Sequence, residues 1–373
     1  FLLDCSSRLA GPHMGYTNSA DVLALRYRDD REVSLRLWNL HLFSSGAFSN
    51  VYRGYAESDT NIPMEVVVKK TWSGSRETTS LTCYEIHILK ILNRLNHPNV
   101  VRLLYSYKTQ YADNTCYSLI FEFLPLNLYQ YLKKHNRHIA IIETKMFAWQ
   151  LFRGQFHLLR AGICHRDIKP QNLLVNENTG LLKIGDFGSS AIEPRKSPQP
   201  SYHVTRYYRP PELLLGSKVY GCEVDIWSSA CVFGEMVYGA VLFPGKSTMN
   251  QMELYIENFG LPTDYEVSAM NASKSKWKEV KSRYAHKDSS KKFSRMFNIS
   301  KDCPAEAVAI LGRMLVYVPT SRLHGHELLS DPFFKEIFDK TSRRPCGRPI
   351  GCLSIDDYIE AMSGDRSMTG SFL

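Results

Sequence analysis

Residues 165–172 read His-Arg-Asp-Ile-Lys-Pro-Gln-Asn, and Asp-Phe-Gly follows at residues 186–188. Asp167 can accept the proton of a hydroxyl nucleophile, and Lys169 can neutralise charge on a phosphoryl group in transfer. Asn172 and Asp186 offer hard oxygen ligands of the kind that magnesium prefers. Together the two motifs predict phosphoryl-transfer chemistry.

The composition of the 373-residue chain limits the classes of protein to consider. Its hydrophobic fraction of 44% is enough for a sizeable core and for more than one domain. No run of about 18 apolar residues occurs, so no membrane span or membrane partner is expected. Nine cysteines without a C-x-x-C pair favour a reduced intracellular protein, in the cytoplasm with the nucleus also open. The first residue is not Met, so a longer natural N-terminus is expected.

The formal net charge of +9 fits either a nucleic-acid binder or an enzyme that acts on acidic or phosphorylated substrates. The densest basic run, residues 274–292, has few aromatic residues. It therefore favours a solvated surface insert over a nucleic-acid patch, and no nucleic-acid partner is expected.

The two opening motifs resemble the catalytic core of eukaryotic protein kinases, H-R-D-L-x-x-x-N followed by D-F-G. The resemblance implies a bilobal α+β fold, with a small antiparallel β-sheet lobe carrying one main helix and a larger, mainly helical lobe. ATP and Mg²⁺ are the implied cofactors, and protein substrates the implied partners. The implied organisation is an N-terminal extension at 1–30, an N-lobe at 31–124, a C-lobe at 125–338 with an insert around 246–304, and a C-terminal tail at 339–373.

The turn at residues 43–51 resembles the kinase glycine-rich loop but departs from it. Gly46 stands at the middle glycine position, whereas Ser44 and Ser49 stand at the outer two. Glycine matters there because backbone amides must approach the phosphates closely, so looser phosphate binding is expected. The resemblance places four residues of this turn at ATP: Phe43, Gly46, Phe48 and Val51.

Residues 64–70 are a β-branched strand that ends in two lysines and resembles the kinase V-A-I-K strand. Lys69 is thereby the candidate for the α- and β-phosphates. The family's partner glutamate lies in the next helix, expected at 79–95, where Glu85 is the candidate. Family spacing arrives at Ile88 instead, so either the helix is one turn longer or the ion pair is altered.

Residues 119–125 resemble the hinge between kinase lobes. Phe121 would close the back of the adenine pocket, and the backbone of Glu122 and Leu124 would bind the adenine edge. Val67 and Leu174 would cover the two faces of the ring.

Residues 162–174 and 202–212 look like glycogen synthase kinase-3. The insert marks the wider group of cyclin-dependent and mitogen-activated kinases (CMGC). Lys169 and Thr205 follow the serine/threonine-kinase pattern, and a helix at 247–260 resembles the region where that family docks scaffold proteins. The resemblance implies structural roles for four residues: Thr205 bonding Asp167 and Lys169, Glu212 paired with Arg322, and Asp225 anchoring the catalytic loop.

The resemblance also implies a regulatory site. Tyr202 falls at the activation-loop tyrosine that the family autophosphorylates, and Arg206 and Arg209 are placed to hold its phosphate. Arg166 has two candidate roles, which are to brace the activation loop or to bind a substrate phosphate.

The family reads a priming phosphate on its substrates with three cations, and the corresponding residues here are Tyr84 (His87 in the other register), Arg166 and Ala191. Because one cation remains of three, weakened priming dependence is expected. Two functions stay open at this point. An active serine/threonine kinase is favoured by the charged catalytic residues, and a pseudokinase that acts as a signalling scaffold is favoured by Ser44, Ser49 and the register of Glu85.

Overall fold

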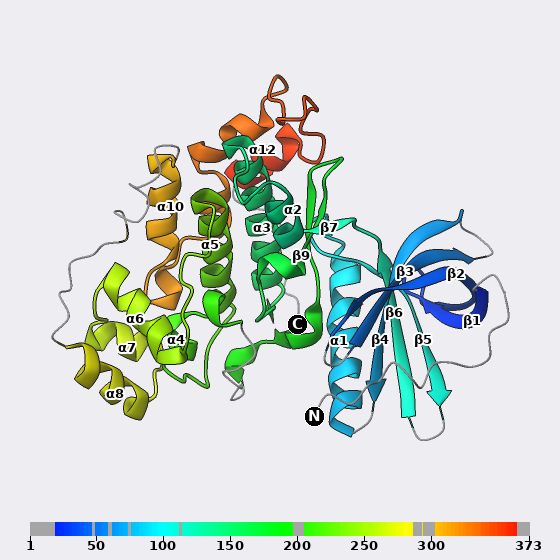
Figure 1. The fold of residues 1–373 in the computed structure, drawn as a ribbon, viewed down its shortest axis with the longest axis horizontal. Coiled ribbons are helices and arrows are strands. Elements are labelled where there is room, and N and C mark those ends of the chain that lie inside the picture. Colours follow the sequence, from blue (N-terminus) through cyan, green and yellow to red (C-terminus); the bar gives the residue numbers. More distant parts are fainter. Residues whose placement is uncertain are drawn as a thin grey trace. The chain divides into compact units, whose positions relative to one another are not determined.

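The computed structural model describes residues 19–46, 49–58, 62–73, 76–111, 114–196, 205–285, 293 and 303–363. The chain divides into two compact units, Phe1–Tyr84 with Arg102–Phe123, and Glu85–Val101 with Leu124–Leu373. The first unit is built on an antiparallel sheet and the second is mainly helical (Figure 1), which confirms the expected bilobal α+β class.

The sheet of the first unit closes on itself as a barrel of six antiparallel strands in the order β1-β2-β3-β4-β6-β5. Alternate residues of each strand point inward, and Leu35, Leu37, Val66 and Val68 form part of the buried core. The strands are β1 (Ser19–Arg26), β2 (Arg31–Ser45), β3 (Ser49–Ser58), β4 (Met64–Ser73), β5 (Leu103–Tyr111) and β6 (Asn114–Glu122).

The extension expected at residues 1–30 is wrong in part, because β1 belongs to the barrel and pairs along its length with β2. Ala24 and Arg26 are buried, and Arg26 forms an ion pair with Asp29 in the following turn. The alternation is hard to see in the sequence because Leu23 is apolar and yet 67% exposed.

The second unit is organised around α3 (Ile141–Arg160), which is buried on most sides. Phe152 packs edge-to-face against Phe233 of α5 at 5.6 Å, and the Trp149 indole donates to the Leu329 carbonyl at 3.0 Å. No helix in the described ranges has the length and apolarity to cross a bilayer. The other α-helices within the described residues are α1 (Arg76–Leu95, which begins in the first unit), α2 (Leu128–Lys134), α4 (Pro211–Leu214), α5 (Glu223–Tyr238), α6 (Thr248–Phe259), α7 (Asp264–Ala269), α8 (Lys274–Tyr284), α10 (Ala305–Met314), α11 (Gly325–Leu329) and α12 (Ile355–Ser363).

Short strands of the second unit frame the loop at 165–172. β9 and β10 form an antiparallel hairpin that β7 extends, and β11 pairs with β8 directly before the loop. These strands are β7 (Leu126–Asn127), β8 (Ile163–Cys164), β9 (Leu173–Asn176), β10 (Leu181–Ile184) and β11 (Ala191–Ile192).

The insert expected around residues 246–304 contains two helices that the sequence did not predict, α7 and α8. Thr263 caps α7 through a reciprocal capping box with Glu266. Val280 and Tyr284, four residues apart, bury one side of α8. The spacing is hard to recognise in the sequence because most of the other residues of α8 are basic or polar.

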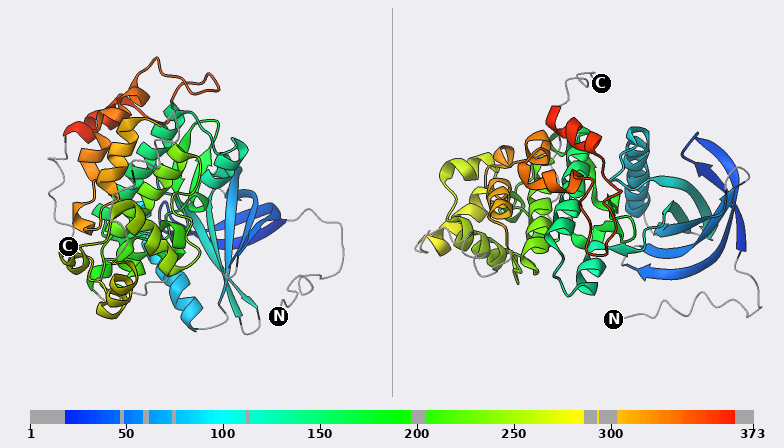
Figure 2. Two further views of the ribbon diagram at one scale, coloured as in Figure 1. Left: turned by 60° about the vertical axis from the view of Figure 1, so that its left-hand side comes forward. Right: turned by 90° about the horizontal axis from the view of Figure 1, so that it is seen from above.

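The C-terminal tail expected from residue 339 contains regular structure in its described part, residues 339–363. This part includes α12, which packs against α11 (Figure 2). The Tyr358 ring stacks on Phe338 with centroids 4.9 Å apart. The sequence carries little local signal in this region because polar tail residues are held by contacts distant in sequence.

Candidate active site

The backbone of the catalytic loop is held by Asp225 near the start of α5. Its carboxylate accepts the backbone N–H of His165 at 2.6 Å and that of Arg166 at 2.9 Å, as expected for the loop anchor. Burial raises the pKa of Asp225, and the charge of His165 and these two N–H bonds oppose that rise. Arg166 has a φ of 66°, in the left-handed region, and the anchored amides hold this strained turn in place.

Asp167 lies at the centre of a polar cluster. Lys169 Nζ donates to Asp167 Oδ2 at 2.6 Å, and Asn172 Nδ2 donates to the same oxygen at 3.0 Å. Thr205 Oγ1 donates to Asp167 Oδ1 at 2.8 Å and accepts from Lys169 Nζ at 3.1 Å. The two contacts expected of Thr205 are therefore present, and they fix the orientation of the Asp167 carboxylate.

Asn172 and Asp186 lie at the two open ends of the β9–β10 hairpin. Asn172 directly precedes β9, and Asp186 lies two residues after β10. The Asn172 amide nitrogen is turned toward Asp167, which leaves Oδ1 as the atom of ligand type. Asp186 is exposed and has a φ of 61°, and the backbone amide of the preceding residue, Gly185, donates to the Asn172 carbonyl at 2.9 Å. An amide oxygen and a carboxylate fit the hard-oxygen preference of Mg²⁺.

The segment after Asp186 is held by the loop that precedes it. His165 Nε2 lies 2.9 Å from the Gly185 carbonyl oxygen, and its ring packs edge-on against Phe187. The Arg166 guanidinium donates to the carbonyls of Ser189 at 2.5 Å and Ser190 at 3.2 Å, and Arg166 is 7% exposed. Arg166 has two candidate roles, to brace the activation loop or to bind a substrate phosphate. The structure contains contacts of the kind that bracing requires. Sequence reasoning missed these acceptors because a backbone carbonyl leaves no signal in residue type.

The Glu212–Arg322 pair implied by the resemblance is present and buried. Two parallel bonds of 2.7 Å join the guanidinium to the carboxylate. Arg322 also donates to the carbonyls of Val316 and Glu223, so its charge is well satisfied.

One face of the barrel carries the expected nucleotide-binding residues of the first unit. Val51 pairs with Lys69 across β3 and β4, and Val67 pairs with Phe121 across β4 and β6. These residues share a face because Val66 and Val68 of β4 point the other way, into the core.

The β2–β3 turn beside this face is tightly hydrogen-bonded. Gly46 N donates to Ser49 O at 2.8 Å, and Ser45 Oγ donates to Asn50 Oδ1 at 2.8 Å. Phe43, before the turn, contacts Phe123 edge-on with centroids 6.1 Å apart. Phe48 lies outside the described residues.

Glu85 lies on α1 and is 5% exposed. This helix runs from Arg76 to Leu95, so it begins three residues before the expected start at Thr79 and ends where expected.

The remaining expected positions are dispersed. Glu122 ends β6, Leu124 is buried just after it, and Leu174 is half-buried on β9. Arg206 is exposed and donates to the Lys246 carbonyl at 3.0 Å, whereas the Arg209 carbonyl accepts from the Tyr255 hydroxyl. Tyr202 lies outside the described residues.

Comparison with known proteins supports the resemblance to protein kinases that the sequence motifs indicate. The protein kinase domain model matches residues 39–334. Protein kinase gsk31 of Schizosaccharomyces pombe is 35% identical over 277 residues, which cover 72% of this chain and 70% of the relative. Protein kinase gsk3 of the same yeast is 34% identical over 305 residues, covering 80% and 74%. The chain therefore belongs to the protein kinase family, and within it to the serine/threonine kinases that resemble glycogen synthase kinase-3.

Proposed function

We propose that this kinase uses Asp167 as the general base that accepts the proton of a substrate serine or threonine hydroxyl. Lys169 neutralises charge on the phosphoryl group in transfer, and Asn172 and Asp186 hold Mg²⁺. Mg²⁺ held by these two residues would supply positive charge to neutralise the phosphates of ATP. The observation that carries the proposal is the cluster at Asp167, where Lys169, Asn172 and Thr205 hold the carboxylate in one orientation.

We further propose that the first unit contributes the ATP side of the reaction. Lys69 binds the α- and β-phosphates with Glu85 as its partner, while Val51 and Val67 cover adenine on a shared face of the sheet. The tight turn at Gly46 binds the phosphates with fewer glycines than in related kinases, so a raised KM for ATP is expected.

The test of the catalytic assignment compares the wild type with Asp167→Asn on a generic basic protein substrate with Mg²⁺ and ATP. Loss of the general base is expected to lower kcat by about 10²- to 10⁴-fold with little change in the KM for ATP. Equal background phosphorylation by both proteins would instead support the alternative function of a catalytically weak pseudokinase scaffold.

Dependence on a priming phosphate is proposed to be weak. The support is that Arg166 is engaged by the carbonyls of Ser189 and Ser190. At the position of the family's lysine, Ala191 is buried in the β8–β11 pair. A charge-assisted hydrogen bond contributes roughly 1.5–3 kcal/mol, so a site with one cation in place of three binds phosphate much less tightly.

A peptide pair with and without a phosphoserine at the priming position measures this directly. We expect kcat/KM values that differ by less than about tenfold, or roughly 1.4 kcal/mol, because the one remaining cation, Arg166, already donates to two backbone carbonyls. A preference of 100-fold or more for the primed peptide would overturn the proposal.

We also propose a regulatory site and a docking region, both supported by the resemblance to glycogen synthase kinase-3. Phosphorylated Tyr202 would be held by Arg206 and Arg209, and a scaffold protein would dock near α6. The cytoplasm, with the nucleus as a second site, is the proposed location.

A further inference from the structure

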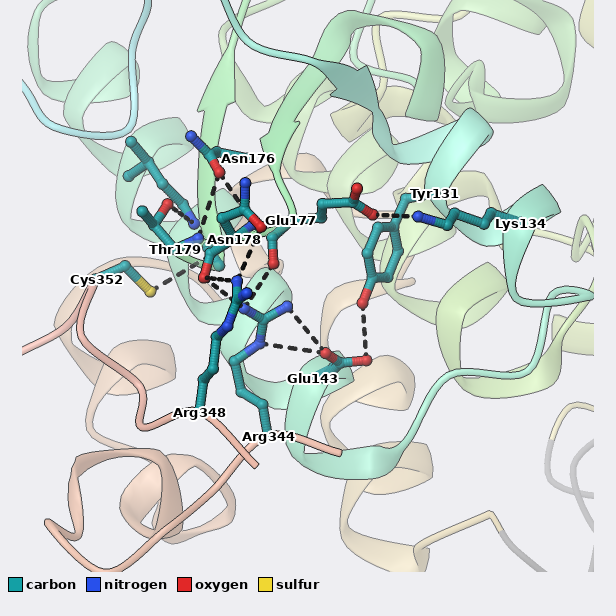
Figure 3. Close-up of polar contacts among 12 residues, drawn as sticks. Tyr131, Lys134, Glu143, Asn176, Glu177, Asn178, Thr179, Arg344, Arg348 and Cys352 are labelled. Carbon is teal, nitrogen blue, oxygen red and sulfur yellow. Dashed lines mark hydrogen bonds and ion pairs between the residues drawn. The ribbon is translucent and has the colours of Figure 1, made fainter. Parts of the chain in front are cut away.

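The C-terminal tail crosses the turn that joins β9 to β10 (Figure 3). We call residues 339–363 the tail strap. Its Arg344 is 3% exposed, and the guanidinium donates to Glu143 Oε1 from Nε at 3.2 Å and from Nη2 at 3.1 Å. Tyr131 donates to the other oxygen of Glu143 at 2.9 Å. Buried charges are therefore matched where the strap meets the start of α3.

The same guanidinium reaches the turn itself. Arg344 Nη1 donates to the carbonyls of Glu177 at 2.8 Å and Asn178 at 3.3 Å. Two further strap residues add contacts, with Arg348 donating to the Asn178 side chain at 2.8 Å and Cys352 to the Gly180 carbonyl at 3.4 Å. The strap thus supplies donors to three of the carbonyls in the turn.

The turn has little room to move on its other side. Gln150 of α3 donates to the Gly180 carbonyl at 2.9 Å and accepts from the Leu182 amide at 2.9 Å. A Cβ at Gly180 would lie 2.8 Å from the Met146 sulfur, and the φ of +79° there disfavours other residues. The turn is therefore held between α3 and the strap.

The opposite end of this hairpin carries the two metal-binding candidates. β9 begins directly after Asn172, and β10 ends two residues before Asp186. The strands pair in register from Leu181↔Asn176 to Ile184↔Leu173, so only about 10 Å of hydrogen-bonded ladder separates the turn from the metal side. A displacement of the turn would move both candidate ligands together.

We propose that Arg344 is a positioning residue for the Mg²⁺ ligands Asn172 and Asp186, acting through the β9–β10 hairpin. The inference rests on the metal roles proposed for those two residues. The planar guanidinium of Arg344 is suited to this positioning role because it donates to the Glu143 carboxylate and to two carbonyls at once. A lysine ammonium cannot donate to all three with this geometry.

The test compares Arg344→Ala with Arg343→Ala, a matched loss of charge at an exposed neighbour whose guanidinium donates to carbonyls of the strap itself. The first readout is hydrogen exchange of the metal-free protein over residues 173–186. The second is Mn²⁺ affinity in the presence of a non-hydrolysable ATP analogue, followed by electron paramagnetic resonance. A double variant, Glu143→Gln with Arg344→Met, removes the turn contacts without leaving a buried charge unpaired.

We expect Arg344→Ala and the double variant to speed exchange in the hairpin and to weaken Mn²⁺ binding by about 3- to 10-fold. This is less than the 10- to 100-fold typical of residues that directly support a metal ligand, because Arg344 acts one step further away. The KM for a peptide substrate should not change. Hairpin exchange and Mn²⁺ affinity equal to those of Arg343→Ala, whatever the melting temperature, would overturn the inference.

An Asp186→Asn variant separates this outcome from failure of the metal assignment. Unchanged Mn²⁺ affinity in Asp186→Asn would show that the assigned ligands are wrong. Weakened affinity there, with normal affinity in both Arg344 variants, would reject the positioning role alone.

Discussion

Thr205 joins the end of the activation segment to the catalytic loop through its hydroxyl group, and its backbone amide adds a longer bond to Asp167 Oδ1 at 3.3 Å. The hydroxyl donates to Asp167 and accepts from Lys169, so one oxygen atom orients both the proposed base and the proposed cation. A hydroxyl that donates to a carboxylate makes a charge-assisted bond, whose loss leaves Asp167 Oδ1 with only the longer bond from the Thr205 amide among the contacts of Thr205.

Replacing Thr205 with alanine is therefore expected to lower kcat by about tenfold, the effect of losing roughly 1.4 kcal/mol of transition-state stabilisation. Steady-state kinetics on a peptide substrate measures it, with the KM for ATP little changed. Thr205→Ser keeps the hydroxyl and should retain most of the activity. Equal loss in both variants would show that the methyl group, not the hydrogen bond, matters.

At the scale of single residues, many contacts of the candidate site could be predicted from residue types alone. The contacts of Asp167 and the Glu212–Arg322 pair were predictable because charged motif residues need particular partners. The acceptors of Arg166 were not predictable, because Ser189 and Ser190 contribute only carbonyl oxygens.

At the scale of elements, two stacked histidines join the loop after α1 to α3. The His97 and His157 rings lie 4.4 Å apart, and His97 Nδ1 accepts the Asn99 amide. Burial, followed by the charges of His157 and nearby Arg153 and Lys183, lowers the pKa of His97 to about 2. Burial, then Arg160 and Arg153, lowers the pKa of His157 to about 4.

These lowered pKa values predict how stability depends on pH. The unfolded chain protonates these histidines near pH 6.5 and the folded protein does so only at lower pH, so their contribution is present above pH 6.5. It is lost as the pH falls from 6.5 through about 4 for His157 and onward toward about 2 for His97. Urea unfolding at pH 7, 6 and 5 should show a smaller loss of stability in His157→Phe than in the wild type.

The matched control is His138→Phe, because His138 is exposed. It should keep the pH dependence of the wild type. Identical pH dependence in His157→Phe and the wild type would contradict the prediction.

Elements with regular apolar spacing were predictable, and those held by distant partners were not. The sequence pattern of α3 indicates a buried helix because apolar residues recur through its length. α8 was missed because lysines dominate its sequence, although Val280 and Tyr284 carry the helical spacing. The tail was missed because the partner of Arg344 is Glu143, 201 residues away, and no local pattern announces such a pair.

At the scale of the whole molecule, the net charge of +9 acts on substrates before they reach the site. Positive charge raises the local concentration of acidic peptides, and salt screens this attraction over a distance of about 8 Å at physiological ionic strength. The charge gives no preference for which serine or threonine is phosphorylated, since that depends on local contacts.

The KM for an acidic peptide is therefore expected to rise about threefold or more between roughly 50 and 250 mM salt, with kcat nearly constant. A basic peptide of the same length serves as the control and should show a flat or opposite trend. Parallel salt dependence of the two peptides would show that net charge does not govern substrate encounter.

The buried Arg344–Glu143 pair also bears on where this enzyme ends as a folding unit. The match to the protein kinase domain model ends at residue 334, before Arg344. A protein shortened to that boundary would keep Glu143 in its buried place and lose the guanidinium that neutralises it, a change that costs about 3–5 kcal/mol when a buried pair is broken. The end of the family match and the end of the buried ion-pair network therefore differ, and a protein cut at residue 334 is expected to unfold more easily than one that retains Arg344.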